Sequence, residues 1–169
     1  IIDSITHVKY SDKDLTILPI VGSGGIGKTT LVQHIYHSQE VQKHFQVKVW
    51  ICVSQNFIVS KLTEEIEKAI PGVEGEKKGR AEELIEQRLN SKRFLLILDD
   101  IWKCESEDWE RLLVPLRKVQ AKGNVILVTT RFPAIAEMVK TTDSSIDLEG
   151  LEQGVFRDFF RACIFRDEQ

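Results

Sequence analysis

The sequence predicts an α/β fold in three layers, in which a mostly parallel five-stranded sheet is flanked by helices. Short runs rich in Val, Ile and Leu alternate with longer amphipathic or charged stretches, as strands and helices alternate in βα units. Two of these runs, residues 94–98 and 125–129, are apolar almost throughout, which is typical of strands buried in a parallel sheet. The length of 169 residues suits one such core.

Five apolar runs supply the expected strands. They are residues 15–21, 47–53, 94–98, 125–129 and 145–148, and the last is the weakest. Pro19 lies inside the first run. Because proline cannot donate a ladder hydrogen bond, we expect local strain or a bulge at this position.

Helical spacing between the runs predicts the covering helices. They are residues 28–37, 59–70, 80–89 and 133–139. Pro71 and Gly72 give a strong stop to the second of them, and Pro133 suits the first turn of the last. The charged, glycine-rich residues 72–79 are expected to form a mobile loop.

Composition excludes several classes of protein. Lys and Arg total 23 against 26 Asp and Glu, a net charge of −3, so we expect no nucleic-acid partner. The longest apolar runs fall far short of the roughly 20 residues that cross a bilayer, so we expect no membrane span. Three distant cysteines without a C-x-x-C pair favour reduced thiols and an intracellular location. We expect the cytoplasm, with the nucleus as the alternative.

Residues 22–29 (GSGGIGKT) match the pattern G-x-x-x-x-G-K-[ST], placed between an expected strand and an expected helix. Glycines allow successive backbone N–H groups to face one concavity, and the helix N-terminus adds partial positive charge. This motif therefore predicts a P-loop NTPase fold that binds ADP or ATP with Mg²⁺. The candidate nucleotide-binding residues are Gly22, Gly24, Gly25, Ile26, Gly27, Lys28, Thr29 and Thr30.

Each polar residue of the loop has an expected role. Lys28 would bridge β- and γ-phosphate oxygens, the Thr29 hydroxyl would ligate the metal, and Thr30 would reach the α-phosphate. The alternative is a glycine-rich turn with an exposed lysine. A dinucleotide-binding G-x-G-x-x-G loop is also present, but that fold needs an acidic residue at the end of the second strand, and residues 47–53 contain none.

Two carboxylates follow the third strand. Asp99 would hold the Mg²⁺, and Asp100 would orient or deprotonate an attacking water. Because the carboxyl ends of parallel strands meet at one edge of the sheet, these acids should lie near the glycine loop. The alternative is ordinary turn or helix-capping chemistry.

Polar residues also follow the fourth strand, where residues 129–131 are Thr-Thr-Arg. Arg131 is a candidate sensor of the γ-phosphate, because a cation there would register whether the third phosphate is present. The alternative is a solvated arginine near a helix start. Lys28, Asp100 and Arg131 are thus the candidate catalytic residues.

Together these motifs resemble the NB-ARC nucleotide-binding domain of plant intracellular immune receptors with leucine-rich repeats. Besides the glycine loop, the segments that carry the resemblance are residues 49–55 (VWICVSQ), 96–102 (LILDDIW), 129–131 (TTR) and 148–151 (LEGL), in family order. Trp102 after the acids resembles the coiled-coil class of these receptors rather than the TIR class.

The resemblance implies a molecular switch for plant defence, bound to ADP at rest and to ATP when active, with at most slow ATP hydrolysis. It implies self-association on activation, and as partners the helical subdomains and leucine-rich repeats of the same receptor. It assigns the roles given above to Lys28, Thr29, Asp99, Asp100 and Arg131. Two alternatives share the phosphate loop: a multiple-turnover ATPase or small-molecule kinase, and an interaction module with a vestigial site.

Three segments are expected along the chain: residues 1–14 as a lead-in, 15–148 as the nucleotide-binding core and 149–169 as the start of a following helical subdomain. The chain begins Ile-Ile-Asp without Met, so we expect flanking parts of a longer protein.

Overall fold

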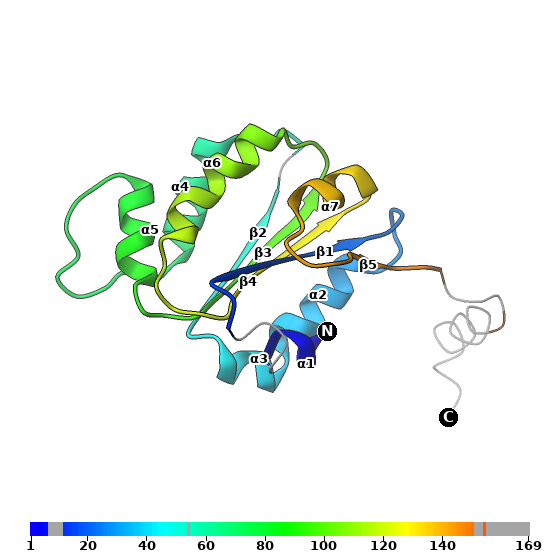
Figure 1. Cartoon of the computed structure of the whole chain (residues 1–169), viewed down its shortest axis with the longest axis horizontal. Helices are drawn as coiled ribbons and strands as arrows, with labels where there is room; N and C mark the ends of the chain where they lie inside the picture. The colour runs from blue at the N-terminus through cyan, green and yellow to red at the C-terminus, as the bar shows by residue number, and fades with distance from the viewer. Residues whose placement is uncertain (7–11, 54, 151–153, 155–169) are drawn as a thin grey trace, which may run out of the picture.

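The structure, a computed structural model, describes residues 1–6, 12–53, 55–150 and 154. Its described part confirms the predicted three layers around a five-stranded sheet (Figure 1). The paired strands are all parallel, in the order β2-β3-β4-β1-β5. Their bounds are β1 (Leu15–Val21), β2 (Val47–Cys52), β3 (Phe94–Ile101), β4 (Asn124–Thr130) and β5 (Ile146–Asp147).

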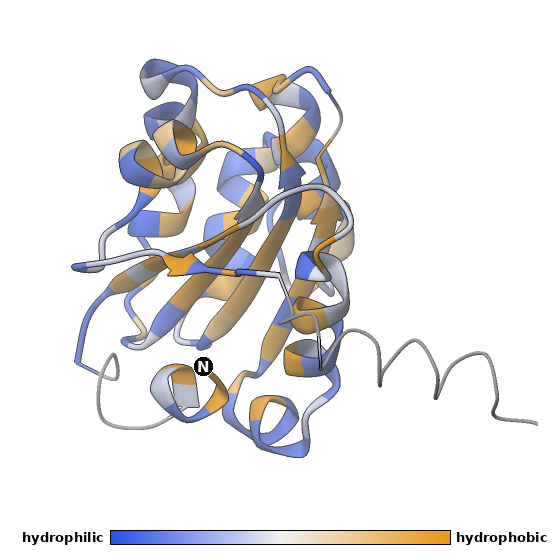
Figure 2. Ribbon diagram, turned by 90° about the vertical axis from the view of Figure 1, so that its right-hand side faces the viewer, coloured by the Kyte–Doolittle hydropathy of each residue, from blue (hydrophilic) through white to orange (hydrophobic). Residues whose placement is uncertain are grey.

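Helices cover both faces of the sheet. One face carries α1 (Ile2–Thr6), α2 (Lys28–His37) and α3 (Gln39–His44), and the other carries α4 (Val59–Ala69), α5 (Ala81–Leu89), α6 (Ser106–Arg117) and α7 (Pro133–Val139) (Figure 1). Successive strand residues point to opposite faces, so Ile97 packs toward α2 while Leu96 and Leu98 pack toward α4 to α7. Figure 2 shows the apolar strands between helices of mixed hydropathy.

The strand order places the residues that follow β1, β3 and β4 at one edge of the sheet, here called the functional edge. β4 lies between β1 and β3, with Leu127 paired to Leu18 on one side and to Ile97 on the other. Because all three strands run in the same direction, their carboxyl ends share one edge. The polar end of β4 therefore separates the loop after β1 from the acids of β3.

Pro19 causes no bulge, so that expectation was wrong. The pairing of β1 with β4 runs without interruption through Pro19 and Val128. Ile17 and Val21 direct their backbone groups away from β4: Ile17 N–H donates to Thr141 Oγ1, and Val21 C=O accepts from Leu148 N–H. Pro19, two residues from each, faces the same side, where β5 pairs only from Ile20 onward. No β1–β4 hydrogen bond needs its missing N–H.

The predicted helices are present within one residue at each end, and α1, α3 and α6 are additional to the prediction. α6 has a clear apolar stripe through Trp109, Leu112, Leu113 and Leu116, all buried. Pro115 lies in its last turn, where a proline weakens the sequence signal for a helix although only the end of the helix is affected.

The outer segments are described only in part. The expected subdomain start at residues 149–169 lies outside the described residues apart from 149, 150 and 154. Among the helices that the structure does describe, none has the length and apolar content needed to cross a bilayer.

Candidate functional site: a phosphate loop facing two acids and an arginine

The loop after β1 is built on glycine conformations. Gly25 and Gly27 have φ values of 77° and 102°, which L-residues with a Cβ adopt only at a cost. Gly27 is the N-cap of α2 and its carbonyl accepts from Leu31 N–H at 2.8 Å. The chain thus turns directly from the sheet into a helix whose N-terminus faces the functional edge.

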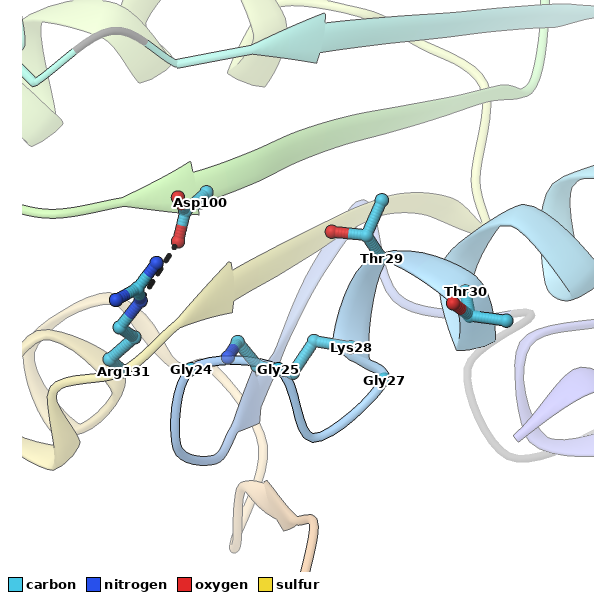
Figure 3. Close-up of a pocket in the computed structure, with 8 residues that line it drawn as sticks. All are labelled: Gly24, Gly25, Gly27, Lys28, Thr29, Thr30, Asp100 and Arg131. Carbon is cyan, nitrogen blue, oxygen red and sulfur yellow. Dashed lines mark ion pairs between the residues drawn. The ribbon is translucent and has the colours of Figure 1, made fainter. Parts of the chain in front are cut away.

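A pocket of about 220 Å³ opens against this loop (Figure 3). Its lining residues are Gly24, Gly25, Gly27, Lys28, Thr29, Thr30, Asp100 and Arg131. Most of the candidate residues are therefore together at one site. Gly22 and Ile26 instead shape the loop from behind: a Cβ on Gly22 would meet Ile26 Cγ2 at 2.9 Å and Leu148 O at 3.0 Å. That these two residues contact the nucleotide stays a prediction.

Lys28 lies folded against the loop. Its ammonium donates to Gly22 O at 2.8 Å and Ser23 O at 2.9 Å, and the residue is only 7% exposed. Burial lowers the pKa of Lys28 below 10.5, opposed by Asp100 and Asp99 and reinforced by Arg131. A poorly solvated cation beside the backbone N–H groups of a glycine loop is an arrangement that an anion would stabilise.

Asp99 joins three elements. This carboxylate is 4% exposed, and its oxygens lie 3.2 and 3.1 Å from the Thr29 hydroxyl at the start of α2. The Thr129 hydroxyl of β4 donates to Asp99 Oδ1 at 2.5 Å. Sequence reasoning gave Thr129 no role of its own, since its position beside Asp99 depends on the strand order.

The two acids lie within β3 rather than after it. The register with β4 shifts between Leu98 and Ile101, and Asp100 has a φ of 62°. Asp100 N–H donates to Thr129 Oγ1 at 2.8 Å. This bulge gives the neighbouring acids different partners, so Asp99 contacts the hydroxyls and Asp100 faces the arginine.

Arg131 lies across the mouth of the site. Its Nε is 3.6 Å from Asp100 Oδ1, as the dashed line in Figure 3 marks. Its guanidinium stacks over Trp102 at 4.3 Å from the ring centroid, and Trp102 Nε1 donates to Asp100 Oδ2 at 2.8 Å. Sequence reasoning used Trp102 only as a family marker and missed these contacts.

The donor set fits a hard divalent cation. Among the described residues, no group of three or more His, Cys, Asp or Glu side chains gathers that would form an all-protein metal site. Mg²⁺ in phosphate-binding sites takes only one or two protein oxygens and completes its shell with phosphates and water. The Thr29 hydroxyl and the Asp99 carboxylate, already in contact, are donors of that kind.

Comparisons with known proteins agree with this geometry. The NB-ARC domain family matches residues 2–169. The chain is 40% identical over 130 residues to disease resistance protein RGA2 of Solanum bulbocastanum, covering 75% of this chain and 13% of that protein. It is 31% identical over 136 residues to disease resistance RPP13-like protein 4 of Arabidopsis thaliana, covering 80% of this chain and 16% of that protein. The chain thus spans a small fraction of these relatives' length.

Solved structures support the fold. The ADP form of the Aeropyrum pernix ORC2 protein matches with a TM-score of 0.59 at 17% identity, covering 88% of this chain and 46% of that one. A signal transduction ATPase with numerous domains (STAND) from Pyrococcus horikoshii, with a tetratricopeptide repeat sensor, matches with a TM-score of 0.57 at 18% identity, covering 99% of this chain and 25% of that one. The relatives named above are plant disease resistance proteins. The family match, together with a phosphate loop that faces paired acids, shows that the chain belongs to the NB-ARC domain family of nucleotide-binding P-loop proteins.

Proposed function

We propose that this domain is the ADP/ATP switch of a plant intracellular immune receptor, ADP-bound at rest and ATP-bound when active. The observation that carries the proposal is the Thr29–Asp99 contact, at 3.2 and 3.1 Å, beside the Lys28 ammonium. It brings the phosphate loop and the acidic strand into one site. A phosphate tail would satisfy the loop amides, and Mg²⁺ would be held by Thr29 and Asp99.

Each residue then has a stated task. Lys28 would leave the Gly22 and Ser23 carbonyls for phosphate oxygens, and Thr30 would contact the α-phosphate. Arg131, a lining residue of the pocket, would bind the third phosphate and so distinguish ATP from ADP. Bound magnesium would supply charge neutralisation at the phosphates.

Slow hydrolysis follows from the state of Asp100. This carboxylate is the candidate to orient water, but one of its oxygens accepts from Trp102 Nε1 at 2.8 Å and the other faces Arg131 Nε at 3.6 Å. A general base must reach the proton that it abstracts. Even when Arg131 has moved to the third phosphate, the Trp102 indole still occupies Asp100 Oδ2, so Asp100 is poorly placed to activate water, which favours a switch over a multiple-turnover ATPase or kinase.

The wider setting is part of the same proposal. We infer that the domain works in the cytoplasm within a longer receptor, alongside helical subdomains and leucine-rich repeats, and self-associates on activation. The small share of the disease resistance relatives that the chain spans, 13% and 16%, supports a longer receptor. The compartment, the neighbouring domains and self-association are carried over from the family resemblance.

The first experiment measures thermal unfolding with and without ADP or ATP in the presence of Mg²⁺. A ligand at a hundred times its Kd stabilises by about 2.7 kcal/mol, which in a domain of this size raises Tm by roughly 5–10 °C. Lys28→Ala should abolish the shift. Lys118→Ala is the matched control, because Lys118 pairs with Glu86 on the helical face away from the loop.

Steady-state phosphate release separates the two functions. Release at or below about one turnover per hour supports the switch, far below the roughly 1–10³ per second of ordinary enzymes. Turnover in that enzymatic range would establish the alternative. If neither ADP nor ATP raises the Tm, the proposed function is wrong.

A further inference from the structure

We propose that Trp102 is a positioning residue for Arg131 and sets the preference of the site for a nucleoside diphosphate over a triphosphate. The inference rests on the proposed function, since it concerns how the nucleotide site discriminates its ligands. Trp102, Asp100 and Arg131 form a cluster, here called the arginine latch, at the mouth of the pocket.

The latch holds the guanidinium on three sides. Trp102 lies under it at 4.3 Å, Asp100 Oδ1 is 3.6 Å from Nε, and Gly24 approaches so closely that a Cβ there would be 3.0 Å from Nη1. The Arg131 and Asp100 side chains are 40% and 39% exposed. Because exposed ion pairs contribute little on their own, the aromatic stacking is a substantial part of what fixes Arg131.

Trp102 also fixes the carboxylate. Its Nε1 donates to Asp100 Oδ2 at 2.8 Å, while the backbone of Asp100 is held in the left-handed region by the bond from its N–H to Thr129 Oγ1 at 2.8 Å. One indole therefore contacts the cation through its face and the anion through its edge. Loss of the indole would remove one contact from each partner of the pair.

Competition for Arg131 gives the latch its effect. A third phosphate would attract the same guanidinium that Trp102 and Asp100 already bind, so triphosphate binding must first draw Arg131 from the indole ring. A diphosphate makes no such demand. The latch thus weakens ATP binding and leaves ADP binding unchanged, which biases the domain toward the resting nucleotide.

The test compares Kd values for ADP and ATP in wild type, Trp102→Leu and Trp102→Phe. We expect Trp102→Leu to tighten ATP about two- to fivefold, the strength of an exposed cation–π contact, with no change for ADP. Trp102→Phe keeps a ring under Arg131, so its Kd for ATP should lie between those of wild type and Trp102→Leu. Trp50→Phe is the control, because Trp50 of β2 packs against Tyr36 of α2 and does not line the pocket.

A double-mutant cycle decides whether Trp102 acts through Arg131. In an Arg131→Ala background, Trp102→Leu should leave the ADP/ATP ratio unchanged. An equal effect in both backgrounds, no effect in either, or a shift toward ADP would overturn the latch. If wild type binds neither nucleotide, the proposed function fails instead, so the two failures are distinguishable.

Discussion

The hydroxyl of Thr29 lies within 3.2 Å of both carboxylate oxygens of Asp99, although 70 residues separate them in the sequence. The contact crosses from the start of α2 to β3. A second hydroxyl, from Thr129 on β4, reaches the same carboxylate at 2.5 Å. Three elements therefore meet at one buried carboxylate. Of the two threonines whose hydroxyls contact it, Thr29 lines the pocket and Thr129 does not.

Replacing Thr29 with Val tests the metal assignment. The substitution keeps the shape but removes the hydroxyl, and Thr129 still satisfies Asp99, so we expect a loss of only about 1 kcal/mol of stability. The Mg²⁺-dependent part of the nucleotide-induced Tm shift should disappear. Thermal unfolding with ATP in Mg²⁺ and in chelator measures it.

Thr29→Ser provides the control for that measurement, because it restores the hydroxyl on a smaller side chain. Full chelator sensitivity in Thr29→Val would contradict a role for this hydroxyl in holding the metal.

The pKa of Lys28 predicts a pH dependence of stability. Burial lowers this pKa below 10.5, so across the interval between the folded value and 10.5 the unfolded chain binds more protons than the native one. Stability without ligand must then rise with pH through that interval. In urea unfolding at increasing alkaline pH, wild type should gain stability relative to Lys28→Met.

Other lysines deprotonate in the same range, so only the difference between the two proteins is informative. A difference that stays constant, or that moves in favour of Lys28→Met as pH rises, would show that the Lys28 ammonium carries no desolvation cost.

The sequence was sufficient for the parts of the site that depend on local pattern. The glycine loop, the run ending in Asp99 and the start of α2 at Lys28 are each specified by neighbouring residues. Strand order is different, because it depends on pairing between distant segments. β4 lies between β1 and β3, and this order brings Thr129 to Asp99. No local sequence pattern predicts that order.

The bulge at Asp100 is a second feature beyond sequence reasoning. A run of apolar residues followed by Asp-Asp indicates a strand end, whereas the strand continues to Ile101 through a residue with φ of 62°. At Pro19 the sequence predicted an irregularity that is absent. The missing N–H of Pro19 faces the side of β1 where pairing with β5 is short, so no strand hydrogen bond is lost. In both cases the deciding contacts belong to neighbouring strands.

Two glycines of the loop should respond differently to alanine. Gly27 has a φ of 102° with open space around it, so Gly27→Ala costs backbone strain of about 1–2 kcal/mol and lowers Tm by roughly 2–8 °C. Gly24 has no positive φ, but its Cβ would press on the flexible end of Arg131 at 3.0 Å. Gly24→Ala should change Tm by no more than about 1–2 °C.

Thermal unfolding of the two variants without nucleotide gives the comparison. Equal losses would mean that the loop backbone is not held in the conformation described, and a larger loss for Gly24→Ala would mean that Arg131 cannot move aside.

Arg88 gives the last prediction, because it tethers the loop expected to be mobile. Its guanidinium donates to Glu76 Oε2 at 2.8 Å, Glu76 Oε1 at 2.9 Å and Ile70 O at 3.1 Å. It also pairs with Glu67, and its side chain is 11% exposed. This loop, residues 72–79, includes the trypsin targets Lys77 and Lys78. In Arg88→Ala we expect tryptic cleavage at these lysines to accelerate severalfold, since cleavage follows the population of the opened loop.

The same contact predicts an acid-dependent effect. The Arg88 hydrogen bond holds the pKa of Glu76 below 4.5. The stabilisation that this contact gives the loop is therefore complete above pH 4.5, and it is lost as the pH falls through the pKa of Glu76 in the folded protein. The cleavage rate of wild type should therefore approach that of Arg88→Ala in acid, measured with a protease active there. Arg111→Ala, which removes an exposed pair with Asp108 on α6, is the matched control. If Arg88→Ala and Arg111→Ala are cleaved at the same rate as wild type at neutral pH, Arg88 does not restrain the loop.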